Sequence, residues 1–163
     1  MEKDYLEILM ETIASPENVL TFLHNTKNKE VAQNILDYGF QFNSHIDYTT
    51  DCVSAKDIVT VKYFTITRHA YGDFTIIIQI GKQIIEYYSH ILKNKKYHFS
   101  ELFSVKPPVL GSDDDYIYQL APQFVRGFID SKSGELFINS KFNPEYNPRF
   151  FQDNLDKILK EEK

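Results

Sequence analysis

Apolar residues recur at two different spacings along the chain, and the spacing predicts which segments form helices and which form strands. An apolar residue at every third or fourth position gives a helix one face that can pack on a core. This spacing predicts helices over residues 2–13, about 27–38, 84–92 and from Asn147 onward. Runs rich in β-branched and aromatic residues predict strands over 18–24, 59–66, 74–80 and 116–120.

Residues with special backbone preferences mark the ends of these elements. Gly39 is predicted to end the second helix as its C-cap, and Asn25-Thr26 is predicted to begin it as an N-cap. The turn residues 131–134 interrupt a strand-like run over 125–139, which predicts a β-hairpin. The segment 106–113 contains two adjacent prolines and is predicted to be a loop.

The order of the predicted elements indicates the fold class. Helices and strands do not alternate regularly, which favours an α+β fold with a mostly antiparallel sheet and peripheral helices over a doubly wound parallel sheet. The chain has only six glycines and no glycine-rich phosphate loop, in agreement with that choice. Its 163 residues are predicted to form one domain, with an N-terminal helix within 1–15 and a C-terminal helix within 147–163.

Composition and charge narrow the range of partners. Apolar residues make up 42% of the chain and charged residues 25%, as in a folded soluble protein. The net charge is −5, whereas nucleic-acid binding usually leaves a basic footprint. The basic run 93–96 follows a predicted helix, where it complements the helix dipole. Broad duplex binding is therefore disfavoured, while binding of a single nucleotide stays open.

The cysteines and histidines indicate whether the chain can form a metal site or a disulfide. The length of its apolar runs indicates whether it can span a membrane or carry a secretory signal. Cys52 is the single cysteine, so neither an internal disulfide nor a cysteine-based zinc site is expected. The five histidines are scattered, and we expect no metal site. No apolar run approaches the ~20 residues that span a bilayer, and Met1–Asp4 does not begin a secretory signal. We expect a cytoplasmic protein without a membrane partner, with a secreted effector as the alternative.

Three polar motifs lie at the ends of predicted strands. His24-Asn25-Thr26 ends the first strand, and a helix follows. Tyr48-Thr49-Thr50-Asp51 and then Arg68-His69-Ala70-Tyr71-Gly72-Asp73 precede the strand over 74–80. Asp115-Tyr116-Ile117-Tyr118 begins a late strand. Each motif is short, so their order along the chain matters more than any one of them.

Together these motifs resemble the ADP-ribosyltransferase fold, in its poly(ADP-ribose) polymerase and diphtheria-toxin branch, over roughly residues 20–140. That branch carries His-x-Thr/Ser at the end of its first strand, a Tyr in the middle and an acid at the start of a late strand. The resemblance implies a split, mostly antiparallel β-sheet. It also implies an enzyme that takes ADP-ribose from NAD and transfers it to a protein or nucleic-acid acceptor, or to water.

The resemblance also implies which residues bind NAD. His24 and Thr26 would hold the adenosine-side ribose, and the backbone of Asn25 would pair with the nicotinamide amide. Asn25 stands where the family usually has Gly. Tyr71, or alternatively Tyr63, would stack on the nicotinamide ring. Thr49-Thr50 is a further candidate for the middle motif, with Thr50 as its binding residue.

The implied catalytic residues are Asp115 and His24. Cleavage of the nicotinamide–ribose bond passes through an oxocarbenium-like transition state, and a carboxylate beside the ribose stabilises its positive charge. The family usually has Glu at this position, so Asp115 is one methylene shorter. Asp113 and Asp114 precede it, which leaves the register of the acid open among the three.

Each of these residues also has a purely structural interpretation. His24 fits a hydrogen-bonded strand residue, Thr26 a helix cap and Tyr71 an aromatic residue in a turn. The run 113–115 fits a solvated acidic turn. The departures at Asn25 and Asp115 keep open a non-catalytic binding module on the same fold. An RNA 2′-phosphotransferase relative is disfavoured, because the chain has only three Arg to hold an RNA phosphate.

Overall fold

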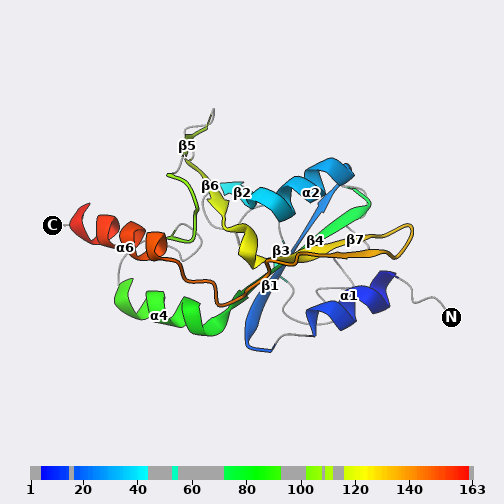
Figure 1. The fold of residues 1–163 in the computed structure, drawn as a ribbon, viewed down its shortest axis with the longest axis horizontal. Coiled ribbons are helices and arrows are strands. Elements are labelled where there is room, and N and C mark those ends of the chain that lie inside the picture. The colour runs from blue at the N-terminus through cyan, green and yellow to red at the C-terminus, as the bar shows by residue number, and fades with distance from the viewer. Residues whose placement is uncertain are drawn as a thin grey trace.

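The computed structural model describes residues 5–14, 17–43, 53–54, 72–92, 102–107, 109–111 and 116–161 (Figure 1). The strands are β1 Val19–Thr26, β2 Phe40–Asn43, β3 Val53–Ser54, β4 Phe74–Gly81, β5 Val109–Leu110, β6 Tyr116–Leu120, β7 Val125–Asp130 and β8 Leu136–Ile138. The helices are α1 Tyr5–Ile13, α2 Lys29–Tyr38, α4 Lys82–Leu92 and α6 Arg149–Glu161, with a short 3-10 helix, η2, at Pro122–Phe124. A five-stranded sheet has the order β3-β1-β4-β7-β8, and a three-stranded sheet has the order β2-β6-β5. Every pairing between the described strands is antiparallel, which confirms the predicted α+β class with antiparallel sheets.

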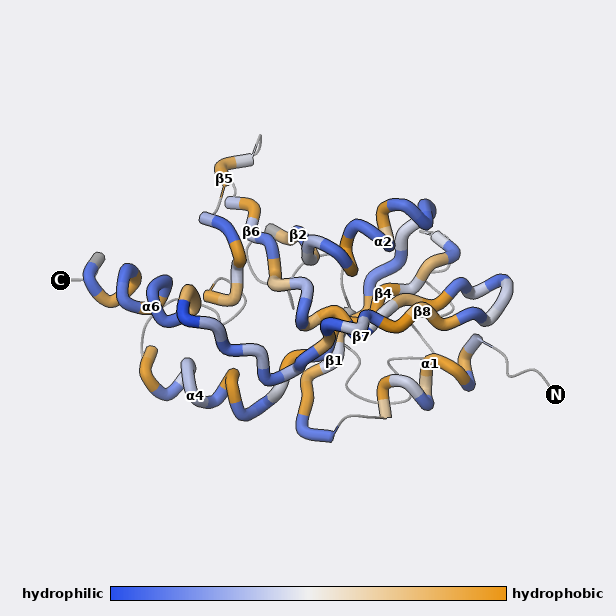
Figure 2. The backbone as a smooth tube through the Cα atoms, viewed as in Figure 1, coloured by the Kyte–Doolittle hydropathy of each residue, from blue (hydrophilic) through white to orange (hydrophobic). Residues whose placement is uncertain are grey.

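Side-chain alternation along the central strands divides the apolar residues between the two faces of the larger sheet. Phe22 and Ile78 belong to the main core, together with apolar residues of α2, α4 and α6. Leu23 and Ile77 belong to a second core, where α1 contributes Leu9. Figure 2 shows the hydrophobic segments concentrated where the strands cross between these helices. Burial on both faces explains why β4 is an almost unbroken apolar run in the sequence.

The start of α2 corrects one prediction. The N-cap is Asn28 and not Asn25-Thr26, because Asn28 Oδ1 accepts a hydrogen bond from the Glu30 backbone N–H at 2.8 Å. Thr26 is paired with Phe74 of β4, so β1 runs two residues beyond its predicted end. The motif His24-Asn25-Thr26 therefore lies at the end of the first strand, as predicted: it forms the last three residues of β1, and the helix cap lies two residues beyond it.

Two further predictions were confirmed, and long-range strand pairing explains where the structure differs from two others. The hairpin over 125–139 is present as β7 and β8, and Gly39 is the C-cap of α2. The loop predicted over 106–113 contains the strand β5, which forms because Val109 pairs with Ile117 of β6. Residues 40–43, for which no regular element was predicted, form β2 because they pair with β6 as well. The strand predicted over 59–66 lies outside the described residues.

We expect the free energy of unfolding to fall above about pH 10, with part of the fall caused by Tyr5. Burial raises the pKa of the Tyr5 phenol, and its hydrogen bond with Thr75 Oγ1 opposes this effect only in part. The contribution of the protonated Tyr5 phenol to the free energy of unfolding is therefore complete below the pKa of Tyr5 in the unfolded chain. It is lost as the pH rises through the pKa of Tyr5 in the folded protein. Urea midpoints measured at about pH 8 and about pH 10.5 should differ less for Tyr5→Phe than for the wild type. Equal differences would contradict this origin of the alkaline instability.

Candidate functional site

A pocket of about 510 Å³ lies between β1, α2 and the smaller sheet. We call it the His24 pocket. Figure 1 shows α2 beside β2 and β6, the elements that form much of its wall. Its volume falls within the range of small-molecule sites in proteins. The lining residues are His24, Val31, Asn34, Ile35, Tyr38, Gly39, Phe40, Gln41, Lys106 and Gln119.

The predicted residue His24 is part of this wall. Along β1, Phe22 and His24 lie on the same face of the sheet, because alternate residues of a strand point the same way. Phe22 is buried in the core, whereas His24 is half-buried and borders the pocket. The imidazole packs against the ring of Phe40, with 5.0 Å between the ring centroids and 59° between the planes. This contact places the imidazole against β2 at the edge of the pocket.

Asn25 and Thr26 neighbour His24 in β1, but neither is among the residues that line the pocket. The alternation of the strand directs the Asn25 side chain to the opposite face from His24. There Asn25 Nδ2 donates a hydrogen bond to the Gly72 carbonyl at 3.1 Å. The side chain of Asn25, which stands where the resemblance expects Gly, therefore takes no space from the pocket.

The end of β1 also touches the segment that follows the predicted Tyr71. A Cβ added to Gly72 would lie 2.1 Å from the carbonyl carbon and oxygen of Thr26, so the two backbones are in direct contact. The structure thus brings the His24-Asn25-Thr26 motif together with the end of the motif over 68–73. Tyr71 itself, Tyr63, Thr50 and the acids Asp113, Asp114 and Asp115 lie outside the described residues.

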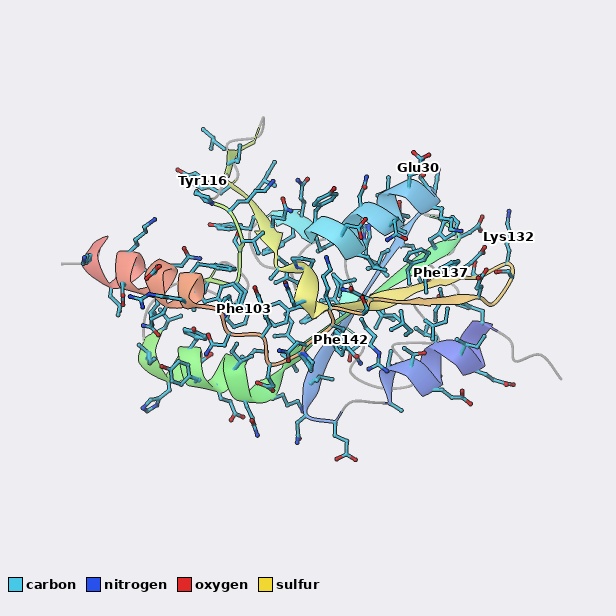
Figure 3. The ribbon with its side chains drawn as sticks, in the orientation of Figure 1. Glu30, Phe103, Tyr116, Lys132, Phe137 and Phe142 are labelled. Carbon is cyan, nitrogen blue, oxygen red and sulfur yellow. The ribbon has the colours of Figure 1, made fainter. Side chains whose placement is uncertain are left out.

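One polar residue of the pocket lining, Gln119, comes from β6. The side chain of Gln119 is buried, and its Nε2 donates a hydrogen bond to the Tyr38 carbonyl at the end of α2. This bond joins β6 to the end of α2. Gln119 is the fourth residue of β6, the strand that Asp115 directly precedes in the sequence. The first residue of β6, Tyr116, is exposed (Figure 3).

The sequence did not identify six polar or aromatic residues of the pocket: Asn34, Tyr38, Phe40, Gln41, Lys106 and Gln119. Only Tyr38 and Phe40 had a local signal, since they flank the predicted C-cap Gly39. Gln119 and Lys106 reach the pocket through the pairing of β6 with β2 and with the segment before β5. These contacts join residues that are far apart in the chain.

The described residues also show whether the chain has a metal site or a membrane-spanning helix. Within the described ranges, no three His, Cys, Asp or Glu side chains lie close enough together to hold a metal ion. The same part of the chain contains no helix with the length and apolar character needed to cross a membrane.

Comparison of the chain with protein-family models, with curated proteins and with solved structures finds no match in any of the three. The residues and geometry of the His24 pocket are therefore the basis for assigning a function.

Proposed function

We propose that the protein binds NAD in the His24 pocket and transfers its ADP-ribose to a macromolecular acceptor, or to water as an NAD glycohydrolase. One observation supports the proposal. His24, the first residue of the His-x-Thr motif, lines a ligand-sized pocket that is also lined by Gln119 of β6, the strand that follows Asp115 in the sequence. The strands β1 and β6, which follow or carry motifs about 90 residues apart in the chain, thus each contribute one residue to the lining of this cavity.

The proposed reaction breaks the bond between C1′ of the ribose and the nicotinamide nitrogen. The bonding electrons leave with nicotinamide, and positive charge develops on the ribose. The acceptor then forms a bond to C1′ through a nucleophilic oxygen or nitrogen and loses a proton. In this scheme the His24 imidazole holds a ribose hydroxyl, and the Asp115 carboxylate stabilises the developing charge. Tyr71 supplies the ring that stacks on nicotinamide.

Release of nicotinamide from NAD tests this proposal. We expect His24→Ala to lower the rate about 100-fold, because a misplaced ribose loses the reactive geometry. Asp115→Ala should abolish release. His90→Ala is the matched control, since His90 is exposed on α4 and does not line the pocket. Wild-type rates in both His24→Ala and Asp115→Ala would exclude this mechanism.

The contact between His24 and Phe40 favours a second candidate, a binding module that does not turn NAD over. The packing of His24 on Phe40 joins β1 to β2 whether or not the imidazole takes part in a reaction. This candidate predicts saturable NAD binding in a calorimetric titration, with no nicotinamide released in the presence or absence of a cell lysate as acceptor. Release that depends on Asp115 would exclude it.

A further inference from the structure

A second, smaller pocket of about 190 Å³ adjoins the His24 pocket. The two pockets share Gln41, Lys106 and Gln119, and we call the two neighbouring pockets together the groove. We call the smaller one the β5 pocket. Its remaining lining residues are mostly apolar: Pro107, Val109, Ile117 and Tyr118. The groove therefore has a large polar and aromatic end, a short shared middle and a small apolar end.

Lys106 is the charged residue at the shared middle. Among the described residues that line the groove there is no Asp, Glu or Arg and no other Lys. The chain as a whole is acidic, with a net charge of −5. A lysine with no carboxylate among the described lining residues of the groove offers a positive charge that attracts an anionic group of a ligand.

The backbone of Lys106 is held in place by buried hydrogen bonds. The hydroxyl of Ser104 donates to the Lys106 carbonyl at 2.8 Å and accepts from the Gln119 backbone N–H at 3.0 Å. Ser104 is buried, and the Val105 N–H also donates to the Gln119 carbonyl at 2.8 Å. These hydrogen bonds attach the backbone of residues 104–106 to β6. The Cα atom of Lys106 therefore has a defined position beside the two pockets.

We propose that the groove binds a dinucleotide with its diphosphate at Lys106, one nucleoside in the His24 pocket and the base of the other nucleoside in the β5 pocket. Lysine binds phosphate oxygens as a point charge and needs no fixed fork geometry. The larger pocket accommodates a nucleoside, and the smaller one offers an apolar surface for a single ring. This inference deepens the proposed function and rests on it, because it names the residues that hold the two halves of NAD and the link between them.

Titration calorimetry with NAD, AMP, nicotinamide mononucleotide and adenosine tests the arrangement. Lys106→Gln should weaken NAD binding about tenfold and leave the binding of uncharged adenosine unchanged. Lys157→Gln is the matched control, because Lys157 is exposed on α6, away from the groove. Equal NAD affinity in Lys106→Gln and the wild type would overturn the placement of the diphosphate.

A second pair of variants tests the β5 pocket. Val109→Trp fills the β5 pocket and should weaken NAD binding. It should leave the affinity for AMP unchanged, because the resemblance places the adenosine-side ribose at His24. Leu110→Trp is the matched control, since Leu110 is also exposed in β5 but does not line the groove. Equal losses for Val109→Trp and Leu110→Trp, or no loss in either, would overturn the assignment of the second nucleoside.

The two proposals fail in different ways. If the protein releases nicotinamide but the Lys106 and Val109 variants bind NAD as the wild type does, the proposed function stands. The proposal that NAD binds along the groove is then wrong. If NAD binding depends on both residues but no nicotinamide is released, the proposal that NAD binds along the groove is supported. The proposed transfer of ADP-ribose is then excluded. Absence of NAD binding by the wild-type protein would overturn both.

Discussion

Replacing Phe103 with Ala should lower the free energy of unfolding by about 3–5 kcal/mol, the usual cost of deleting a fully buried aromatic ring. Phe103 has no exposed surface, and it lies in the core between elements distant in sequence (Figure 3). Its ring centroid is 5.5 Å from that of Tyr88 in α4, 5.3 Å from Phe124 in η2 and 4.9 Å from Phe151 in α6. The cavity left by Ala would be bordered by three separate elements, so one movement cannot close it.

Urea denaturation measures this effect, with two control variants. Phe103→Leu retains most of the apolar volume and should cost about 1–2 kcal/mol. Phe150→Ala removes a ring that packs on Phe151 with 4.6 Å between centroids but remains half-buried, and it should cost less than Phe103→Ala. A loss for Phe103→Ala no larger than that for Phe150→Ala would show that the cluster does not hold these elements together.

Features set by neighbouring residues were predictable from the sequence. The turn residues 131–134 specify a hairpin locally, and Gly134 has the positive φ of +76° that such a turn requires. The apolar run of β4 and the glycine that ends α2 were equally visible. The N-cap of α2 was placed wrongly because Thr26 and Asn28 are both good caps. The pairing of Thr26 with Phe74, a distant residue, decides between them.

The candidate site was only partly predictable, for the same reason. The motif that contains His24 is short and continuous, so its residues stand out in the sequence. Lys106 and Gln119 carry no such signal, because an exposed lysine and a glutamine in a strand are ordinary residues. They become part of a groove only when β6 pairs with β2 and β5 and brings them to the side of His24.

Gly39→Ala should cost about 3–5 kcal/mol of stability, since it combines a forbidden backbone conformation with a collision. Gly39 has φ +107° and ψ 171°, a region that is essentially restricted to glycine. A Cβ at this position would lie 2.0 Å from the carbonyl oxygen of Leu120, whose backbone is paired with Phe40. Neither the helix before Gly39 nor the strand after it can yield without breaking hydrogen bonds.

The same substitution should also weaken NAD binding, because Gly39 joins α2 to β2 within the wall of the His24 pocket. Any shift that relieves the collision with Leu120 moves Tyr38 and Phe40, which border that pocket on either side of the glycine. Gly134→Ala is the control, since it places Ala at a positive φ in the β7–β8 turn, away from the pocket. We expect Gly134→Ala to lose about 1–2 kcal/mol of stability and no NAD affinity. If both variants destabilise the protein but retain the wild-type affinity for NAD, the nucleotide does not bind against the α2–β2 junction.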